Sequence, residues 1–147
     1  MKYIALTVVV VVTSLTSSFC HAVFPTIGII KKVQGEVYLI SAFTEIQAVS
    51  NMELIAGDQL ITGIDGSIGL IFKDDTVAAL GPSSQLEIED FVFKPMEQKL
   101  AFAVKMVRGT FSFKTGQIAK LAPQKVTLKT PNASLTARAA KFVVAVK

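Results

Sequence analysis

Hydrophobic and polar residues alternate along most of the chain after residue 22. Ile68, Leu70 and Phe72, for example, are separated by single residues that would point to the opposite side of an extended strand. A period of two is typical of β-strands that bury one face and expose the other. The same alternation predicts further short strands around Val37 and Leu39, Val77 and Ala79, Leu86 and Ile88, Phe102, Val104 and Met106, and Val126 and Leu128.

Turn-forming residues separate these segments at intervals of about eight to twelve residues, a spacing typical of all-β domains. The strongest hairpin signal is Asp65-Gly66, because a type I′ turn needs positive φ at both of its central residues. Gly109 marks a change of phase, since hydrophobic residues have even numbers before it and odd numbers after it, at Phe111 and Phe113. We therefore expect a bulge or corner at Gly109 that turns the strand over.

Helical signals are weak after residue 22. The segment from 133 to 140 contains good helix formers, but its continuation from Phe142 to Val146 is typical of a strand. We predict a strand there, and no helix elsewhere in residues 23–147. The fold class predicted for this part of the chain is all-β.

The first 22 residues have the layout of a secretory signal peptide, which we predict to be helical. Lys2 supplies a positive charge, and Ala22 ends a more polar stretch suited to cleavage. The apolar run between them, from Ile4 to Leu15, is too short to span a bilayer, which needs about 20 residues. Cleavage after Ala22 would leave one domain, residues 23–147, in the periplasm or outside the cell.

Two other interpretations of the N-terminus stay open. Cys20 follows an apolar run, as in lipoproteins, although Phe19 stands where processing needs a small residue. An uncleaved N-terminal membrane anchor is the other alternative, because Pro25 and its apolar neighbours would hinder cleavage.

The composition excludes several kinds of catalytic site. The single Cys and the single His, Cys20 and His21, lie within the predicted signal peptide, and the chain has no Trp. Residues 23–147 therefore lack a Ser-His-Asp triad, a Cys nucleophile and an ordinary zinc or copper site. We expect a protein that is not an enzyme and binds no metal or cofactor. Two acidic groups without the spacing of a calcium loop are interpreted as structural, namely Asp74 and Asp75, and Glu87, Glu89 and Asp90.

Charge divides the domain into two halves. Residues 23–97 contain 11 acids and 4 bases, a net charge of −7, whereas residues 98–147 contain no acid and 10 bases, a net charge of +10. Two interpretations stay open. Strand pairing could mix the halves so that the surface charge averages out, or a stacked fold could keep them apart as an acidic part and a basic part.

A separate basic part would attract anionic partners outside the cytoplasm. We expect an acidic envelope protein or an anionic polysaccharide or lipid surface, and not nucleic acid, because export removes that target. Self-association through opposite charges is a further option. The candidate binding residues are Lys99, Lys105, Arg108, Lys114, Lys120, Lys125, Lys129 and Lys141.

A longer pattern runs through residues 30–37, 57–72, 74–88, 107–111 and 126–133. Its most specific block reads Gly57-Asp58-Gln59-Leu60-Ile61-Thr62-Gly63-Ile64-Asp65-Gly66-Ser67. From about Gly28 onward, the chain resembles FecR-domain proteins. The resemblance identifies a set of motif residues that we expect to form structural turns: Gly57, Asp58, Thr62, Gly63, Asp65, Gly66, Ser67 and Gly109.

The chain departs from the family pattern at two places. Asp75 stands where the family usually has the Gly of an Asp-Gly turn, and Ala139 stands where an Arg-Gly-Thr sequence is usual. Ala in a left-handed turn is strained, so the last strand pair is expected to be rearranged.

The resemblance implies a periplasmic all-β domain of short stacked strands and hairpins in a solenoid-like or roll arrangement. In membrane-bound regulators of this family, such a domain relays a signal from an outer-membrane receptor to a sigma factor. That role needs a cytoplasmic region and a transmembrane helix, neither of which the sequence indicates. We therefore expect a stand-alone, exported, non-catalytic binding or scaffold module of the bacterial envelope, with an accessory role in envelope signal transduction as the alternative.

Overall fold

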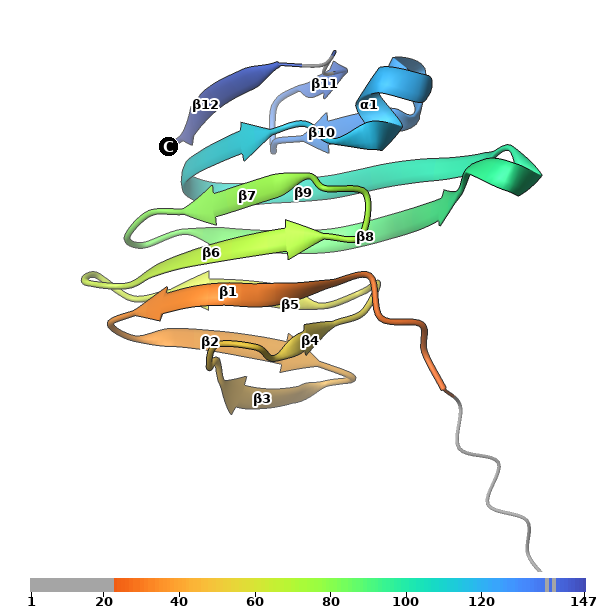
Figure 1. The fold of residues 1–147 in the computed structure, drawn as a ribbon. Coiled ribbons are helices and arrows are strands. Elements are labelled where there is room, and N and C mark those ends of the chain that lie inside the picture. The colour runs from red at the N-terminus through yellow and green to blue at the C-terminus, as the bar shows by residue number, and fades with distance from the viewer. Residues whose placement is uncertain (1–22, 137, 139) are drawn as a thin grey trace, which may run out of the picture.

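The computed structural model describes residues 23–136, 138 and 140–147. The predicted signal-peptide helix, with Cys20 and the cleavage site after Ala22, lies outside the described residues. The rest of the chain forms strands stacked in two sheets, with the N-terminal strands at one end of the stack and the C-terminal strands at the other (Figure 1). The predicted all-β fold class is therefore confirmed.

Each sheet follows a simple order along the stack. The first contains, in order, β4 (Glu53–Leu54), β1 (Gly28–Gln34), β6 (Ser67–Phe72), β7 (Val77–Leu80), the second part of β9 (Lys99–Lys114) and β12 (Lys141–Val146). The second contains β3 (Thr44–Gln47), β2 (Val37–Ser41), β5 (Gln59–Thr62), β8 (Gln85–Lys94), the first part of β9, β10 (Val126–Lys129) and β11 (Ser134–Thr136). All of these pairs are antiparallel except β9 with β10, which is parallel.

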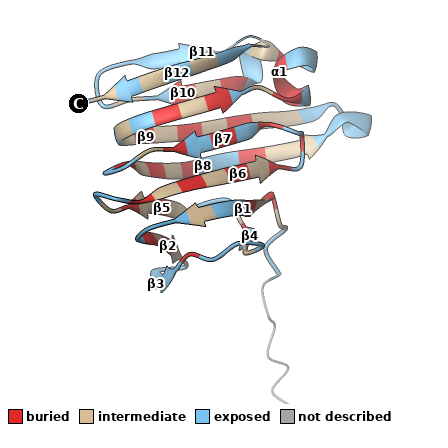
Figure 2. Ribbon diagram, turned by 60° about the vertical axis from the view of Figure 1, so that its left-hand side comes forward, coloured by how far each residue is buried: buried red, intermediate tan, exposed pale blue. Residues whose placement is uncertain are grey.

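The core lies between the two sheets. Residues of the predicted alternation, such as Ile68, Leu70 and Phe72, are buried, and the residues between them are only half-buried. Phe72 also packs edge-to-face against Phe102, with ring centroids 5.1 Å apart. Burial is densest in the middle of the stack and falls toward both ends, where β3 and β11 are exposed throughout (Figure 2).

Gly109 lies where β9 passes from one sheet to the other. Residues up to Arg108 pair with β8 in the second sheet, and residues from Gly109 onward pair with β12 in the first. The buried residues change from even to odd numbers at this point, as predicted. Gly109 has φ of +104°, a conformation that only glycine adopts without strain.

The predicted hairpin at Asp65-Gly66 is wrong. β5 and β6, which flank it, belong to different sheets, and neither residue has positive φ. The segment is a corner that carries the chain between the sheets, and Gly66 is needed there because an added Cβ would overlap the carbonyl oxygen of Glu36. Positive φ at two consecutive turn residues occurs instead at Ala42 and Phe43, between β2 and β3.

The C-terminal region differs from prediction in two further respects. A helix that the sequence did not indicate, α1 (Gln117–Leu121), follows β9, and the 3₁₀ turns η1 (Pro95–Glu97) and η2 (Pro123–Lys125) add to the helical content. Within the predicted strand over 133–140, residues 134–136 form β11, and residues 137 and 139 lie outside the described residues. β12 begins at Lys141 in the other sheet. Outside the C-terminal region, the turn after β6 contains Asp75, which stands where the family usually has glycine. Asp75 has φ of +68°, in the left-handed region that glycine adopts most easily.

Candidate binding edge

The stack has two long edges where the chain passes between sheets or turns back. We call the edge formed by Gly35–Glu36, Thr62–Gly66, Gly81–Ser84 and Gly109–Thr110 the corner edge. The opposite edge, which carries α1 and the turn between β2 and β3, is the helix edge (Figure 1). The motif residues and the basic residues are distributed unequally between them.

Most of the motif residues stack on one another at the corner edge. The Thr62 hydroxyl donates to the carbonyl oxygen of Gly81 at 2.7 Å and accepts from the N–H of Ser84 at 2.8 Å. The N–H of Gly63 donates to the carbonyl oxygen of Glu36 at 2.8 Å, and the N–H of Thr110 donates to the Ser84 hydroxyl at 3.1 Å. These bonds satisfy polar groups that the sheets leave unpaired at each corner.

Gly57 and Asp58 lie on the helix edge, away from the rest of the motif. They form the turn between β4 and β5, where the Oδ2 of Asp58 accepts from the N–H of Ile55 at 2.9 Å. Asp58 is buried, and its Oδ1 has no hydrogen-bond partner among the described residues. The motif therefore combines a packed set of corners with one separate acidic turn.

Three of the eight candidate basic residues lie beside acids. Lys105 is directly opposite Glu87 across β8 and β9. The Nζ of Lys129 lies 2.7 Å from an oxygen of Glu89. Lys99 is 3.8 Å from the carboxylate of Glu97. In the middle of the stack the two charge halves therefore mix and partly compensate each other.

A second group of basic residues gathers at the C-terminal end of the helix edge. Lys114 of β9 and Lys141 of β12 are directly opposite each other, and both are exposed. The other neighbour of Lys114 across the first sheet is the apolar Val77. Like charges directly opposite on neighbouring strands repel each other, and an anion placed between them would relieve that repulsion.

Thr115 brings Arg138 close to this pair. Its N–H donates to the carbonyl oxygen of Ala140 at 3.0 Å, and its hydroxyl accepts from the N–H of Ala140 at 2.7 Å. Its Oγ1 also lies 3.4 Å from the carbonyl oxygen of Arg138, which is exposed. The sequence does not mark Arg138 as part of this group, because only the tertiary contact with Thr115 places it here.

α1 adds Lys120 to the group. Ala119 of α1 and Phe142 of β12 line the same small cavity of about 10 Å³, and Lys120, which follows Ala119, is exposed on the same edge as Lys141. We call Lys114, Lys120, Arg138 and Lys141 the basic corner. Asp75, in the turn before β7, accepts a hydrogen bond of 2.9 Å from the side chain of Gln117. Of the other candidates, Arg108 is exposed near the corner edge and Lys125 lies in η2.

Asp74 holds α1 in place. Its buried carboxylate accepts from the Thr76 hydroxyl at 2.8 Å and from the N–H of Ile118 at 3.3 Å. Its carbonyl oxygen accepts from the N–H of Gln117 at 2.7 Å. This acid therefore has a structural role, and it fixes the helix that carries Lys120.

Other kinds of site are not found in residues 23–136, 138 and 140–147. This part of the chain contains no cluster of three or more His, Cys, Asp or Glu side chains placed to hold a metal ion. Its helices also include none with the length and apolar character needed to cross a membrane.

Comparison with known proteins places the chain in a family. No curated protein matches the sequence, and no solved structure matches the fold. The family described as FecR protein matches residues 58–147, which is more than half of the chain and includes most of both edges. The chain belongs to the FecR protein family.

Proposed function

We propose that this chain is an exported, non-catalytic binding module of the bacterial envelope, and that its basic corner binds an acidic face of a protein partner. The observation that carries the proposal is the direct opposition of Lys114 and Lys141 on neighbouring strands, with the apolar Val77 and no acid on the other side of Lys114. Lys105 and Lys129 also lie directly opposite each other, but each of them has an acid beside it. An uncompensated pair of this kind weakens the fold slightly, by about 0.2–1 kcal/mol, so its presence is better explained by a ligand than by stability.

The surroundings of this pair favour a protein over a simple anion. Val143 lies on the same outward face of β12 as Lys141 and is two-thirds exposed, and Val77 beside Lys114 is also exposed. Apolar residues bordered by charged ones are typical of protein interfaces. An anionic lipid or polysaccharide would use the lysines but gain little from the valines.

The family supports a role in signalling. FecR domains are associated with envelope signal transduction that regulates sigma factors. The second candidate function is therefore an accessory part of such a pathway, in which binding at the basic corner changes the output. If loss of the basic corner changes the output of a sigma-factor-dependent reporter, this role is supported. If the reporter output does not change, the signalling role is contradicted, but the proposed binding is not.

Two matched double variants test the proposed binding. K114Q/K141Q removes two charges from the basic corner, whereas K105Q/K129Q removes two charges that already lie beside acids. Capture of envelope proteins by the purified chain is expected to weaken as salt rises, because exposed charges are screened. K114Q/K141Q should weaken capture about tenfold at low salt, and K105Q/K129Q should change it much less.

A second arm distinguishes the class of partner. Vesicles rich in anionic phospholipid and purified lipopolysaccharide are mixed with the same variants. The chain could bind these vesicles or lipopolysaccharide as strongly as it captures proteins, in a way that depends on Lys114 and Lys141. That result would mean that the partner is an anionic surface and not a protein. Equal losses in both double variants, or binding that ignores salt, would contradict the proposal.

A further inference from the structure

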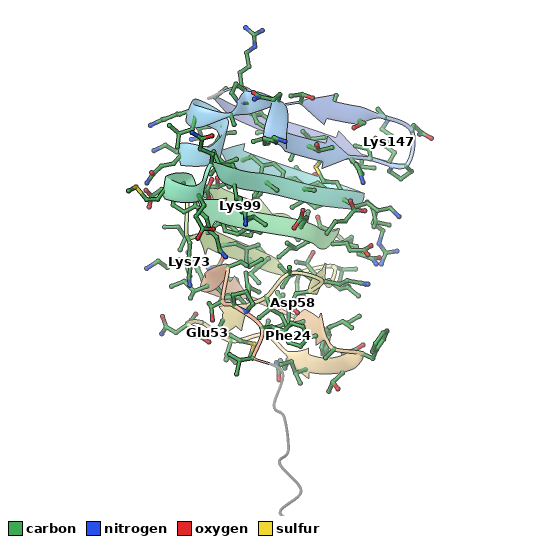
Figure 3. The ribbon with its side chains drawn as sticks, turned by 90° about the vertical axis from the view of Figure 1, so that its right-hand side faces the viewer. Phe24, Glu53, Asp58, Lys73, Lys99 and Lys147 are labelled. Carbon is green, nitrogen blue, oxygen red and sulfur yellow. The ribbon has the colours of Figure 1, made fainter. Side chains whose placement is uncertain are left out.

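The N-terminal end of the helix edge carries a groove of about 240 Å³ between β2, the turn before β5 and the start of the described chain. Phe24 and Phe43 border it, and Ile40 and Ile55 line it together with Asp58. Figure 3 shows Phe24, Asp58 and Glu53 at this end of the stack, whereas Lys147 lies toward the other end. The groove therefore lies on the same edge as the basic corner, but at the acidic end of the molecule.

Phe43 does not stabilise the fold in its observed position. Its side chain is fully exposed, and both Ala42 and Phe43 have positive φ, of 48° and 64°. The left-handed conformation costs a residue with a side chain roughly 1–2 kcal/mol, and glycine or asparagine is the usual choice in such a turn. Phe24, which lines the same groove, is also exposed, and exposed apolar side chains that lie together are typical of an interaction surface.

Asp58 gives the groove a preference for hydrogen-bond donors. The side chain is almost completely buried, one oxygen accepts from Ile55, and Oδ1 has no partner in the described part of the chain. A buried acceptor without a partner costs about 1–3 kcal/mol, which an incoming donor would recover. Glu45, directly opposite the groove residue Ile40, and Glu53, two residues before Ile55, add negative charge. The groove suits an apolar surface that carries basic side chains.

The other end of the same chain has this chemistry. On the strand that carries Lys141, Val143 is exposed, and Leu135 is exposed on β11, the end strand of the other sheet. In the described residues, β11 and β12 each pair on one side only, as do β3 and β4 at the opposite end. Both ends of the stack are therefore open, and they carry opposite charge.

We propose that the acidic partner of the basic corner is the groove end of a second copy of this chain. The inference rests on the proposed function and names its partner. The two surfaces differ, so the contact is heterologous and one copy can continue onto the next along the stacking axis. The occupant of the groove is the basic corner, with the apolar surfaces in contact and the lysines directed toward Asp58, Glu45 and Glu53.

Sedimentation velocity of the purified chain over a range of concentration and salt tests this contact. We expect assemblies that grow with concentration at low salt and dissociate at high salt. Phe43→Gly should abolish assembly while keeping or raising the melting temperature, because glycine relieves the positive φ. D58N should weaken assembly by removing the charge of the acceptor. A chain that stays monomeric at low salt, or an F43G variant that assembles normally, would overturn the proposal.

A mixing experiment tests the head-to-tail geometry. F43G lacks the groove surface but keeps the basic corner, and K114E/K141E lacks the basic corner but keeps the groove. Each variant alone should stay monomeric, and their mixture should form a one-to-one dimer that does not grow further. Failure to form this dimer would exclude the contact between unlike ends.

The same variants separate this inference from the proposed function. If F43G retains its capture of envelope proteins and the wild-type chain does not assemble, the second copy is excluded while the basic corner remains a binding site. If the wild-type chain assembles but its capture of envelope proteins does not depend on Lys114 and Lys141, the basic corner is not the binding site. The proposed contact between the basic corner and the groove is then excluded as well.

Discussion

The corner edge and the helix edge use turns in different ways. At the corner edge, the turns contact one another, and Thr62, Ser84 and Gly109 are fixed by hydrogen bonds or by contacts too close for a side chain. At the helix edge, turns and strand ends carry exposed residues such as Phe43 and Lys141. Much of the most specific block of the sequence therefore maintains the fold, and the residues suited to binding lie mainly on the opposite edge.

The largest effect is expected from Gly109→Ala. An added Cβ would lie 2.5 Å from the Cα of Ser84, and the residue has positive φ, so we expect a loss of about 2–4 kcal/mol in the free energy of unfolding. Gly57→Ala is the matched control, because Gly57 also has positive φ but has open space around it. Urea denaturation should show a loss of only about 1 kcal/mol for the control. Equal losses would mean that backbone strain alone, and not packing of the corners, requires Gly109.

Thr62→Val should have the next largest effect. It keeps the shape of the side chain but removes the hydroxyl that joins Gly81 and Ser84, leaving buried backbone groups without partners. The expected loss in the free energy of unfolding is about 1–3 kcal/mol. Thr127→Val on the half-buried face of β10 is the control and should change stability little. A small effect at Thr62 would show that the corner edge does not depend on these bonds.

Asp74→Ala is expected to act locally at the helix edge. It removes the acceptor for Ile118 and Thr76, so α1 should open without unfolding the stack. Hydrogen exchange should accelerate at Ile118–Leu121, with a global loss of about 1 kcal/mol. Exchange that accelerates equally in the core strands would show that α1 is part of the cooperative unit.

The smallest effects are expected from single lysines, and they should have opposite signs. Lys141→Gln removes repulsion with Lys114 and should raise the free energy of unfolding by about 0.2–0.5 kcal/mol. Lys105→Gln removes attraction to Glu87, whereas the charge of Lys129 directly opposite on β10 is already paired with Glu89, so the substitution should lower the free energy of unfolding by about 0.2–0.5 kcal/mol. Thermal unfolding at low salt measures both changes, and high salt should reduce them. Changes of the same sign would contradict the different environments assigned to the two lysines.

The sequence predicts those features that depend on neighbouring residues. Alternation locates strands such as β6 and β9, and the change of phase at Gly109 is visible because one extra step in a strand reverses its buried face. Asp75 could be recognised as a turn residue because aspartate tolerates positive φ better than most residues.

The features that the sequence did not predict depend on distant contacts. α1 has five residues and no side-chain cap, and its first turn is fixed by Asp74, more than forty residues earlier. Asp65-Gly66 has the composition of a hairpin, but pairing of β5 and β6 with different neighbours makes it a corner. Arg138 enters the basic corner only through Thr115.

Lysine acetylation footprinting can show whether a partner covers the basic corner. The reaction rate of each lysine is measured by mass spectrometry on the free chain and on the chain bound to the envelope partner that it captures at low salt. We expect Lys114, Lys120 and Lys141 to become several times less reactive in the complex, while Lys99, Lys105 and Lys129 change little. Protection of Lys105 and Lys129 without protection of Lys114 and Lys141 would contradict this expectation.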